Sequence, residues 1–334
     1  MARTKRRTIE IAVDERADGV RLDRFVRKLL PELPLSRIHA MIRKREARLN
    51  GAPARGGDRL RAGDSLSLCL APGDADGLEA SLSEEGDENA GGDGPFPVLF
   101  RDEHMLAFDK PTGVAAHPGS GHALRDTVLG ALYRVTGSTG TGIHRPALVG
   151  RLDRDTSGVQ LAGVSPRGLR ELSRLSREGE IHKTYLAVVR DHGLKPAGRI
   201  DLPLMDTRSG RRRMRVARRT GSEKAMTAVT VYRVIARRDG CALVEAEPET
   251  GRQHQIRAHF SHIGAPLAGD ARYGDRAFSE LVTGRTRVRR LFLHCARVHL
   301  THPTTNAELA IASDLPHDLQ HVVDLLLPGS DVDP

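Results

Sequence analysis

The 334-residue sequence is poor in aromatic side chains and in cysteine. It has no tryptophan, and aromatic residues make up only 3% of the chain. A broad surface for stacking exposed bases, as in single-strand-binding proteins, is therefore not expected. The three cysteines, Cys69, Cys241 and Cys295, lie far apart and form no CxxC pair. This pattern disfavours a disulfide framework or a zinc ribbon and predicts a reducing, cytoplasmic environment.

The sequence also lacks the segments that mark membrane-spanning, exported and nucleotide-binding proteins. No apolar run is long enough to cross a bilayer, and the basic N-terminus is not followed by the continuous apolar core of a signal peptide. A P-loop motif is absent. His259 with His262, and His299 with His302, have i, i+3 spacing, but no acid or thiol completes a ligand set. We expect no metal site and no membrane partner.

Positive charge is in excess, and it is distributed unevenly. Lysine and arginine number 52 against 43 acidic residues, which gives a net charge of +9. The segment 72–95 contains eight acidic residues and no basic one, so the rest of the chain carries +17. Such a balance predicts a polyanionic partner, above all a nucleic acid, although a genome that favours arginine would produce the same excess.

The composition divides the chain into five segments. We expect a basic tail and strand over 1–18, a compact unit over 19–71, an acidic disordered linker over 72–95, a larger unit over 96–328 and a short tail over 329–334. The linker is rich in glycine and poor in large apolar residues, so it cannot bury enough surface to offset its chain entropy.

The sequence of the compact unit over 19–71 predicts two helices followed by short strands. Apolar residues recur at helical spacing from Leu22 to Leu30, and Ser36 is the expected N-cap of the second helix. Five basic residues follow on the exposed side, namely Arg37, Arg43, Lys44, Arg45 and Arg48. This small α/β arrangement resembles the S4 RNA-binding domain. The alternative is a generic helical cap whose arginines only solvate a surface.

The larger unit mixes strands and helices without a regular βαβ alternation. Strand-like runs occupy 105–108, 159–164, 184–189, 227–235 and 241–247. Ser165 and Pro166 predict the start of one helix, and Thr250 with Gln253 predicts a capping box for a helix that turns Ile256, Phe260 and Ile263 to one face. The predicted fold class is α+β, with a mixed, largely antiparallel sheet and flanking helices.

Four short motifs carry the functional signal. They are GRLDRDTSG at 150–158, KTY at 183–185, TGRQHQIR at 250–257 and LHC at 293–295. In this order they resemble the RluA-type pseudouridine synthase family, and the resemblance covers nearly the whole chain. The segments HPGSG, SEKAMT and RLFLH are most similar to the RluC branch, which acts on large-subunit ribosomal RNA.

The resemblance implies isomerisation of uridine to pseudouridine in RNA, most specifically 23S ribosomal RNA, free or within a large-subunit precursor. It implies a monomer that needs no cofactor. Asp153 would carry the reaction, by attacking C1′ or by removing the 2′ proton, and Arg257 would pair with it. Tyr185 would stack on the target base and Leu293 would form an apolar wall. Arg151 would fill the space that the flipped base leaves.

Three positions depart from the family pattern. Gly150 replaces a histidine, Asp109 an asparagine and Cys295 an alanine. Gly150 leaves open an alternative, a catalytically impaired S4-type RNA-binding protein associated with the ribosome. A hydrolase that uses Asp153 and Asp155 as a carboxylate pair is a third interpretation.

The stretch 208–219 is rich in arginine and includes Arg211, Arg212 and Arg213. Seven guanidinium groups in so short a span would repel one another without a polyanion, so we expect phosphate contacts. A solvated loop is the alternative.

Overall fold

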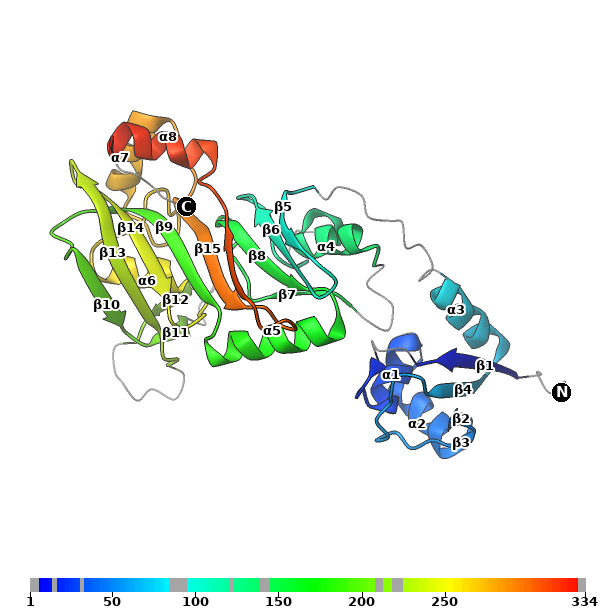
Figure 1. Cartoon of the computed structure of the whole chain (residues 1–334). Coiled ribbons are helices and arrows are strands. Elements are labelled where there is room, and N and C mark those ends of the chain that lie inside the picture. Colours follow the sequence, from blue (N-terminus) through cyan, green and yellow to red (C-terminus); the bar gives the residue numbers. More distant parts are fainter. Residues whose placement is uncertain are drawn as a thin grey trace.

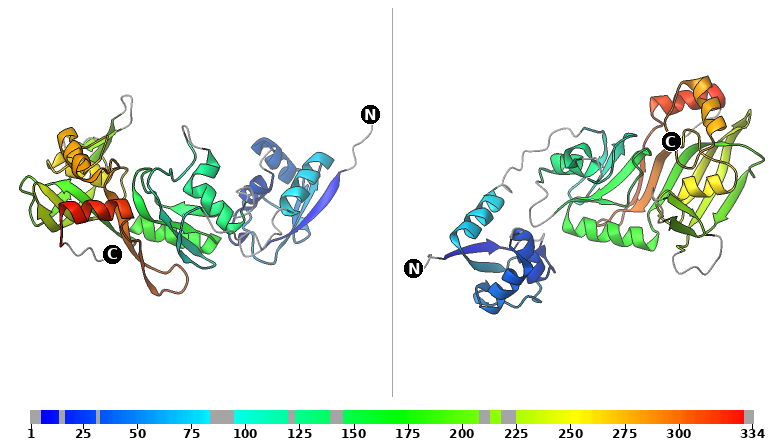
Figure 2. Two further views of the ribbon diagram at one scale, coloured as in Figure 1. Left: turned by 90° about the horizontal axis from the view of Figure 1, so that it is seen from above. Right: turned by 180° about the vertical axis from the view of Figure 1, so that it is seen from behind.

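A computed structural model describes residues 6–13, 17–30, 33–83, 95–119, 123–138, 145–207, 213–217 and 225–329. Figure 1 shows a small N-terminal body beside a larger body built on one long sheet, and Figure 2 shows the same division from two further sides.

The N-terminal body is a four-stranded antiparallel sheet packed against two helices. The strand order is β1 (Arg7–Ala12), β4 (Ser65–Leu70), β2 (Ala47–Leu49) and β3 (Ala52–Pro53). Helices α1 (Leu22–Leu29) and α2 (Leu35–Arg43) bury Phe25 and Ile38 against alternate leucines of β4. This arrangement is consistent with an S4-like domain.

Helix α2 begins earlier than predicted. The carbonyl of Pro34 accepts from the N–H groups of Arg37 and Ile38, so Pro34 is the N-cap residue. Ser36 lies inside the first turn, and its expected capping role is wrong. Proline suits this position because its carbonyl makes the first helical bonds and its missing N–H is not needed there.

The acidic segment does not begin as a disordered linker. Its first twelve residues form helix α3 (Pro72–Ser83), which opens on a proline. Ala75 and Leu78 are fully buried in the N-terminal core, three residues apart on one helical face. Asp76 also pairs with Arg7 at 2.6 Å. The prediction of disorder is therefore wrong for 72–83, and residues 84–94 lie outside the described part of the chain.

The larger body is built on a ten-stranded sheet, which is mixed and largely antiparallel, as predicted. The strand order is β10, β13, β14, β9, β15, β8, β6, β5, with β16 beside β15 and β7 beside β8. Among the described pairs, β8 and β15 run parallel and the others antiparallel. The strands are β5 (Val98–Arg101), β6 (Met105–Lys110), β7 (Ala147–Val149), β8 (Ser157–Gly163), β9 (His182–Arg190), β10 (Ala197–Asp201), β13 (Val229–Arg238), β14 (Cys241–Pro248), β15 (Leu293–Thr301) and β16 (Glu308–Ala312).

Helices cover both faces of this sheet. Alternate residues of β9 and β14 point to opposite sides, because side chains along a strand alternate. Ala187 and Val244 join the core beneath α5 and α6, whereas Val188 and Leu243 pack against α7 and α8. The helices are α4 (Val128–Thr136), α5 (Pro166–Glu178), α6 (Gln255–His262), α7 (Arg276–Thr286) and α8 (His317–Leu326).

The predicted helix start at Ser165 and Pro166 is confirmed. Helix α5 starts at Pro166, and the Ser165 hydroxyl accepts from the N–H of Gly168 at 3.0 Å. Asp239 and Gly240 both have positive φ and connect β13 to β14 as a hairpin. A separate two-stranded ribbon, β11 (Leu204–Thr207) with β12 (Arg213–Val216), flanks residues 208–212.

We predict that Leu78→Ala destabilises the N-terminal body by about 2–5 kcal/mol, because it leaves a cavity in a packed core. Amide hydrogen exchange of β4 in the full-length protein measures this loss directly. Leu35, which is 43% exposed, provides the control. Equal protection in Leu78→Ala and Leu35→Ala would show that α3 does not stabilise this body.

Candidate active site

Asp153 lies in the loop between β7 and β8, and a buried glutamine holds that loop. Gln160, in the middle of β8, is fully buried and accepts from the N–H of Leu152 at 2.9 Å. Its amide nitrogen faces the carbonyls of Val149 and Gly150 at 3.3 and 3.4 Å. The segment that leads into Asp153 is therefore bonded to a rigid strand through three backbone groups. A lone glutamine in the apolar run VQLAG was a signal that sequence reasoning missed.

Arg257 reaches the site from α6, and a second glutamine fixes the start of that helix. The side-chain oxygen of Gln255 accepts from the Thr250 hydroxyl at 2.7 Å and from the N–H of Arg252 at 3.1 Å. Its nitrogen donates to the carbonyl of Val229 at 2.8 Å. The predicted capping box of Thr250 with Gln253 is therefore wrong, because Thr250 bonds Gln255 instead.

The beginning and end of α6 also differ from the prediction. The helix follows His254, which has φ +53° and no side-chain capping bond. Ile256 and Phe260 are buried, but Ile263 lies beyond the helix and is 37% exposed.

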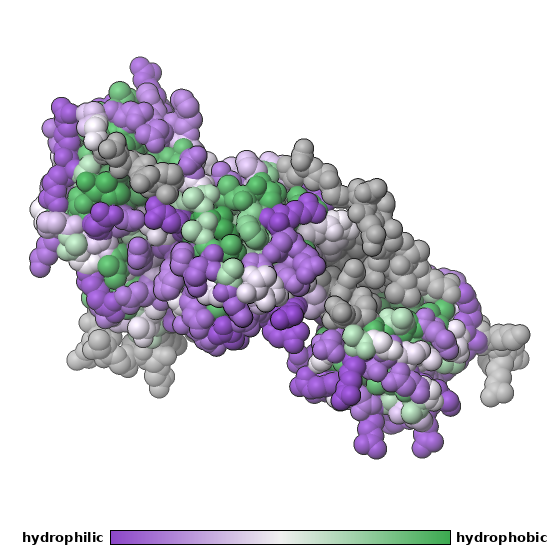
Figure 3. Space-filling model, in the orientation of Figure 1, coloured by the Kyte–Doolittle hydropathy of each residue, from purple (hydrophilic) through white to green (hydrophobic). Residues whose placement is uncertain are grey.

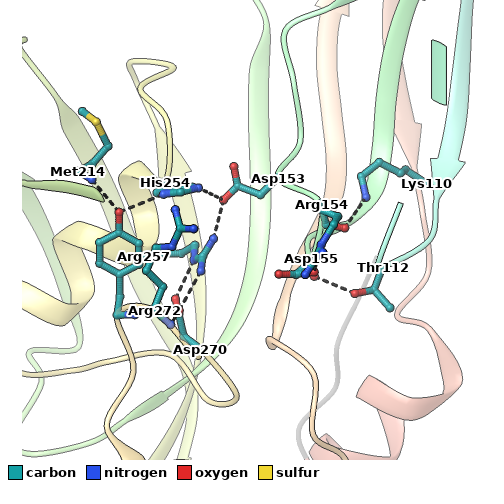
Figure 4. A network of polar contacts seen from close by, with 11 residues as sticks. Lys110, Thr112, Asp153, Arg154, Asp155, Met214, His254, Arg257, Asp270 and Arg272 are labelled. Carbon is teal, nitrogen blue, oxygen red and sulfur yellow. Dashed lines mark hydrogen bonds and ion pairs between the residues drawn. The ribbon is translucent and has the colours of Figure 1, made fainter. Parts of the chain in front are cut away.

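The guanidinium of Arg257 lies between two carboxylates. Its Nη1 donates to Asp153 Oδ2 at 2.9 Å, while Nε and Nη2 donate to Asp270 at 2.7 and 2.8 Å. Asp270 is itself fixed by the backbone N–H groups of Arg272 and Tyr273 (Figure 4). Arg257 is thus locked by Asp270 and presents its remaining corner to Asp153.

The electrostatics of this group favour the charged forms. Burial by itself would raise the pKa of Asp270, but the hydrogen bonds and charge of Arg257 outweigh it, and the pKa is lowered. Burial likewise opposes ionisation of Arg257, yet its bonds to Asp270 and the charge of Asp153 raise its pKa. A fixed positive charge therefore stands beside Asp153 throughout the physiological pH range.

Tyr185 and Leu293 line the same small cavity as Asp153 and Arg257. This cavity has a volume of about 190 Å³, and Arg151 also lines it. Tyr185 comes from β9 and faces Cys295 across the pairing with β15. Burial first, and then the neighbouring Cys295 and Asp153, raise the pKa of Tyr185, so its hydroxyl stays protonated near neutrality.

A wider, basic cavity of about 1300 Å³ adjoins Asp153. It is lined by several arginines, which include Arg151, Arg154, Arg252, Arg272, Arg289 and Arg290. Such a lining fits an extended anion better than a neutral sugar.

The predicted RNA-binding residues of the N-terminal body do not line these cavities. The five basic residues of the N-terminal body, Arg37, Arg43, Lys44, Arg45 and Arg48, are all exposed on α2 and the residues that follow it. Arg211 and Arg212 lie outside the described residues, and Arg213 belongs to β12 with its side chain not described.

The three departures from the family pattern have distinct surroundings. Gly150 has φ +68°, a left-handed conformation that glycine adopts at no steric cost. Asp109 accepts from the hydroxyl of Ser313 at 2.9 Å. Cys295 is fully buried, and burial raises the pKa of its thiol to about 11.

Lys110 is a buried charge that the sequence did not single out. It is fully buried, and its ammonium donates to the carbonyls of Pro111 and Arg154 at 2.8 and 3.1 Å. Burial lowers the pKa of Lys110 to about 7, although Asp155 and Asp153 act in the opposite direction. Lys110 joins the end of β6 to the loop that carries Asp153.

The described residues contain no cluster of three or more metal-ligating side chains. Within the same residues, no helix is long and apolar enough to cross a membrane.

Known proteins resemble this chain in sequence and in fold. The family model described as RNA pseudouridylate synthase matches residues 104–262. The Ribosomal large subunit pseudouridine synthase C proteins of Salmonella typhimurium and Escherichia coli are each 34% identical over 329 residues, which cover 95% of this chain and 96% of each relative.

The solved structure of Human RNA Pseudouridylate Synthase Domain Containing 4 has a TM-score of 0.55 at 24% identity. It covers 75% of this chain and 97% of its own. This likeness concerns the fold.

We predict that Lys110→Met removes a pH dependence of stability. Above pH 7 the folded protein holds Lys110 neutral while the unfolded chain still protonates it, so wild-type stability rises with pH. The wild type should therefore gain up to about 1.4 kcal/mol per pH unit relative to the variant between pH 7 and 9.

Urea unfolding followed by tyrosine fluorescence measures this difference, because all four tyrosines lie in the larger body. Parallel stability curves for the two proteins would contradict the lowered pKa.

Proposed function

Because the chain belongs to the RNA pseudouridylate synthase family, we propose that it isomerises particular uridines of 23S ribosomal RNA to pseudouridine. The observation that carries the proposal is the meeting of Asp153, Arg257, Tyr185 and Leu293 around one small cavity. The relatives named for the large ribosomal subunit match almost the entire length of the chain, which supports the choice of RNA.

The reaction exchanges one bond to C1′ for another. The bond from C1′ to N1 breaks, the uracil turns, a bond from C1′ to C5 forms, C5 loses its proton and N1 gains one, so that the product is an isomer of the substrate. Asp153 acts first, as a nucleophile at C1′ or as the base that removes the 2′ proton. Both routes need an ionised carboxylate, and the Arg257 guanidinium pairs with it at 2.9 Å.

The small cavity has the composition needed to hold a uracil ring. Tyr185 offers a flat aromatic face and a protonated hydroxyl, and Leu293 offers an apolar wall that is 4% exposed. A uridine must leave its stack to reach this depth. Arg151 borders both cavities, which supports the proposal that its side chain fills the position that the base vacates.

We propose a division of labour between the two bodies. The N-terminal body binds RNA through its exposed basic residues, and hydrophilic side chains cover most of its visible surface (Figure 3). The arginines of the wide cavity add phosphate contacts near the reacting uridine, and the arginine-rich segment 208–219 adds further phosphate contacts.

We further propose that the protein works as a monomer in the cytoplasm. Residues of a single chain supply both cavities, and all three cysteines are free thiols.

We predict that Asp153→Asn abolishes pseudouridine formation while RNA affinity stays near that of the wild type. The test is pseudouridine mapping on 23S ribosomal RNA from cells that lack the gene and carry either version. Asp155→Asn is the matched control, because Asp155 is two residues away and pairs with Arg154 at 2.9 Å.

The control should keep wild-type modification. If both variants lose activity equally, a carboxylate-pair mechanism replaces the one proposed. Full modification by Asp153→Asn would refute the role of Asp153.

We predict that replacing Arg37, Arg43 and Lys44 with alanine weakens RNA binding mainly through phosphate contacts. The slope of log K against log salt should become shallower by about 2, since each contact on single-stranded RNA contributes ~0.7. Conversion rates at saturating RNA should not change. An unchanged slope would mean that these residues only solvate the surface.

A further inference from the structure

His254 occupies a backbone conformation that is unusual for its residue type. It has φ +53° and ψ +21°, in the left-handed region, immediately before α6. Histidine adopts this region more readily than most residues, but the conformation is still uncommon and persists where surrounding contacts impose it. The side chain is only 9% exposed.

The imidazole of His254 stands between Asp153 and Tyr273. Its Nε2 lies 3.7 Å from Asp153 Oδ2 (Figure 4), and its Nδ1 lies 3.0 Å from the Tyr273 hydroxyl. The Tyr273 ring also stacks edge-on against the imidazole and lies 5.2 Å from the Arg257 guanidinium. The left-handed turn therefore serves to bring this ring beside the carboxylate.

Tyr273 connects the imidazole of His254 to the neighbouring backbone. The N–H of Met214 donates to the Tyr273 oxygen at 2.9 Å, and the same hydroxyl lies at hydrogen-bond distance from Nδ1 of His254. If this hydroxyl donates to Nδ1, the proton of the neutral imidazole resides on Nε2, the atom that faces Asp153.

We propose that His254 is a positioning residue that orients the Asp153 carboxylate through its Nε2–H, in a tautomer set by Tyr273. The proposal rests on the function proposed above. Arg257 alone contacts Asp153 through a single nitrogen, which leaves the carboxylate free to turn. A second donor on the same Oδ2 fixes that rotation and leaves Oδ1 directed away from both groups (Figure 4).

The distance of 3.7 Å is longer than a formed hydrogen bond. Polar contacts in an unliganded site are often long and tighten when substrate binds. Entry of a uridine would exclude water around Asp153 and strengthen the contact.

The same chain of bonds links Asp153 to the β11–β12 ribbon. Met214 lies in β12, and its side chain packs with Leu204, Ala258 and Tyr273 in one apolar cluster. The ribbon leads directly into residues 208–212, which belong to the arginine-rich segment.

Protonation of His254 would put a second proton on Nδ1 and so break the hydrogen bond that the Tyr273 hydroxyl donates to that atom. Burial lowers the pKa of His254, Asp153 and Asp270 act in the opposite direction, and Arg257 and Arg272 add to the lowering. The hydrogen bond that the Tyr273 hydroxyl donates also favours the neutral ring. Removing that hydroxyl should raise the pKa of His254 and move the acid limb of the rate profile to higher pH.

The test measures single-turnover conversion by the full-length enzyme on unmodified 23S ribosomal RNA transcript from the same organism. His254→Leu should lower the rate on the order of 100-fold with unchanged RNA affinity, because the carboxylate is no longer held in place. His254→Gln should restore most of the rate, since its amide can replace the Nε2–H, and should lose the histidine contribution to the acid limb.

Tyr273→Phe provides a second variant that keeps the ring packed against Arg257. It should shift the acid limb upward while RNA affinity is retained. His259→Gln is the matched control, because His259 is buried in the same helix and bonds Thr230 and Leu202 instead of Asp153. The control should lower thermal stability and leave the rate and its pH dependence unchanged.

A wild-type rate in His254→Leu, or equal losses in His254→Leu and His254→Gln, would overturn the proposal. So would an unshifted acid limb in Tyr273→Phe. Failure of the wild-type enzyme to convert any uridine would instead refute the proposed function.

Discussion

The sharing of one buried guanidinium between two carboxylates is the interaction on which the site depends. Asp270 satisfies two nitrogens of Arg257 and leaves Nη1 for Asp153. A buried arginine without such a partner would carry a large desolvation cost. Asp270 removes that cost and fixes the geometry, so Asp153 gains a positive neighbour without having to stabilise it alone. The loop of Asp270 and the helix of Arg257 therefore act as one unit.

The sheet brings together groups that are remote in sequence. Asp153 precedes β8, Tyr185 lies in β9 and Leu293 begins β15, and these three strands are neighbours in the sheet. Buried glutamines then hold the irregular segments at the strand ends: Gln160 holds the loop of Asp153, and Gln255 holds the turn before Arg257. Rigid strands with amide side chains bonded into the adjoining backbone give the site its precision.

The sequence predicted the type of fold, and short motifs pointed to the residues around the small cavity, because both signals are local. It did not predict Asp270 or Tyr273, since their importance arises from contacts with Arg257 and His254 that only the tertiary fold creates. Helix α3 was missed for a related reason. Two apolar residues, Ala75 and Leu78, outweigh the surrounding acidic composition once a core is present to receive them. Thr250 bonds Gln255 and not Gln253 because of the path that the turn takes, which the sequence alone did not reveal.

The parallel pairing of β8 with β15 affects the order in which the protein folds during its synthesis. His294 and Cys295 lie beside Ser157 and Gly158, so strands more than 130 residues apart in the chain must meet before the sheet closes. On a translating ribosome the residues up to Arg257 emerge well before β15 does. A nascent chain would then already display its basic N-terminal body while its sheet still lacked the central strand between β8 and β9. The sheet that carries Asp153, Tyr185 and Leu293 is therefore completed near the end of synthesis.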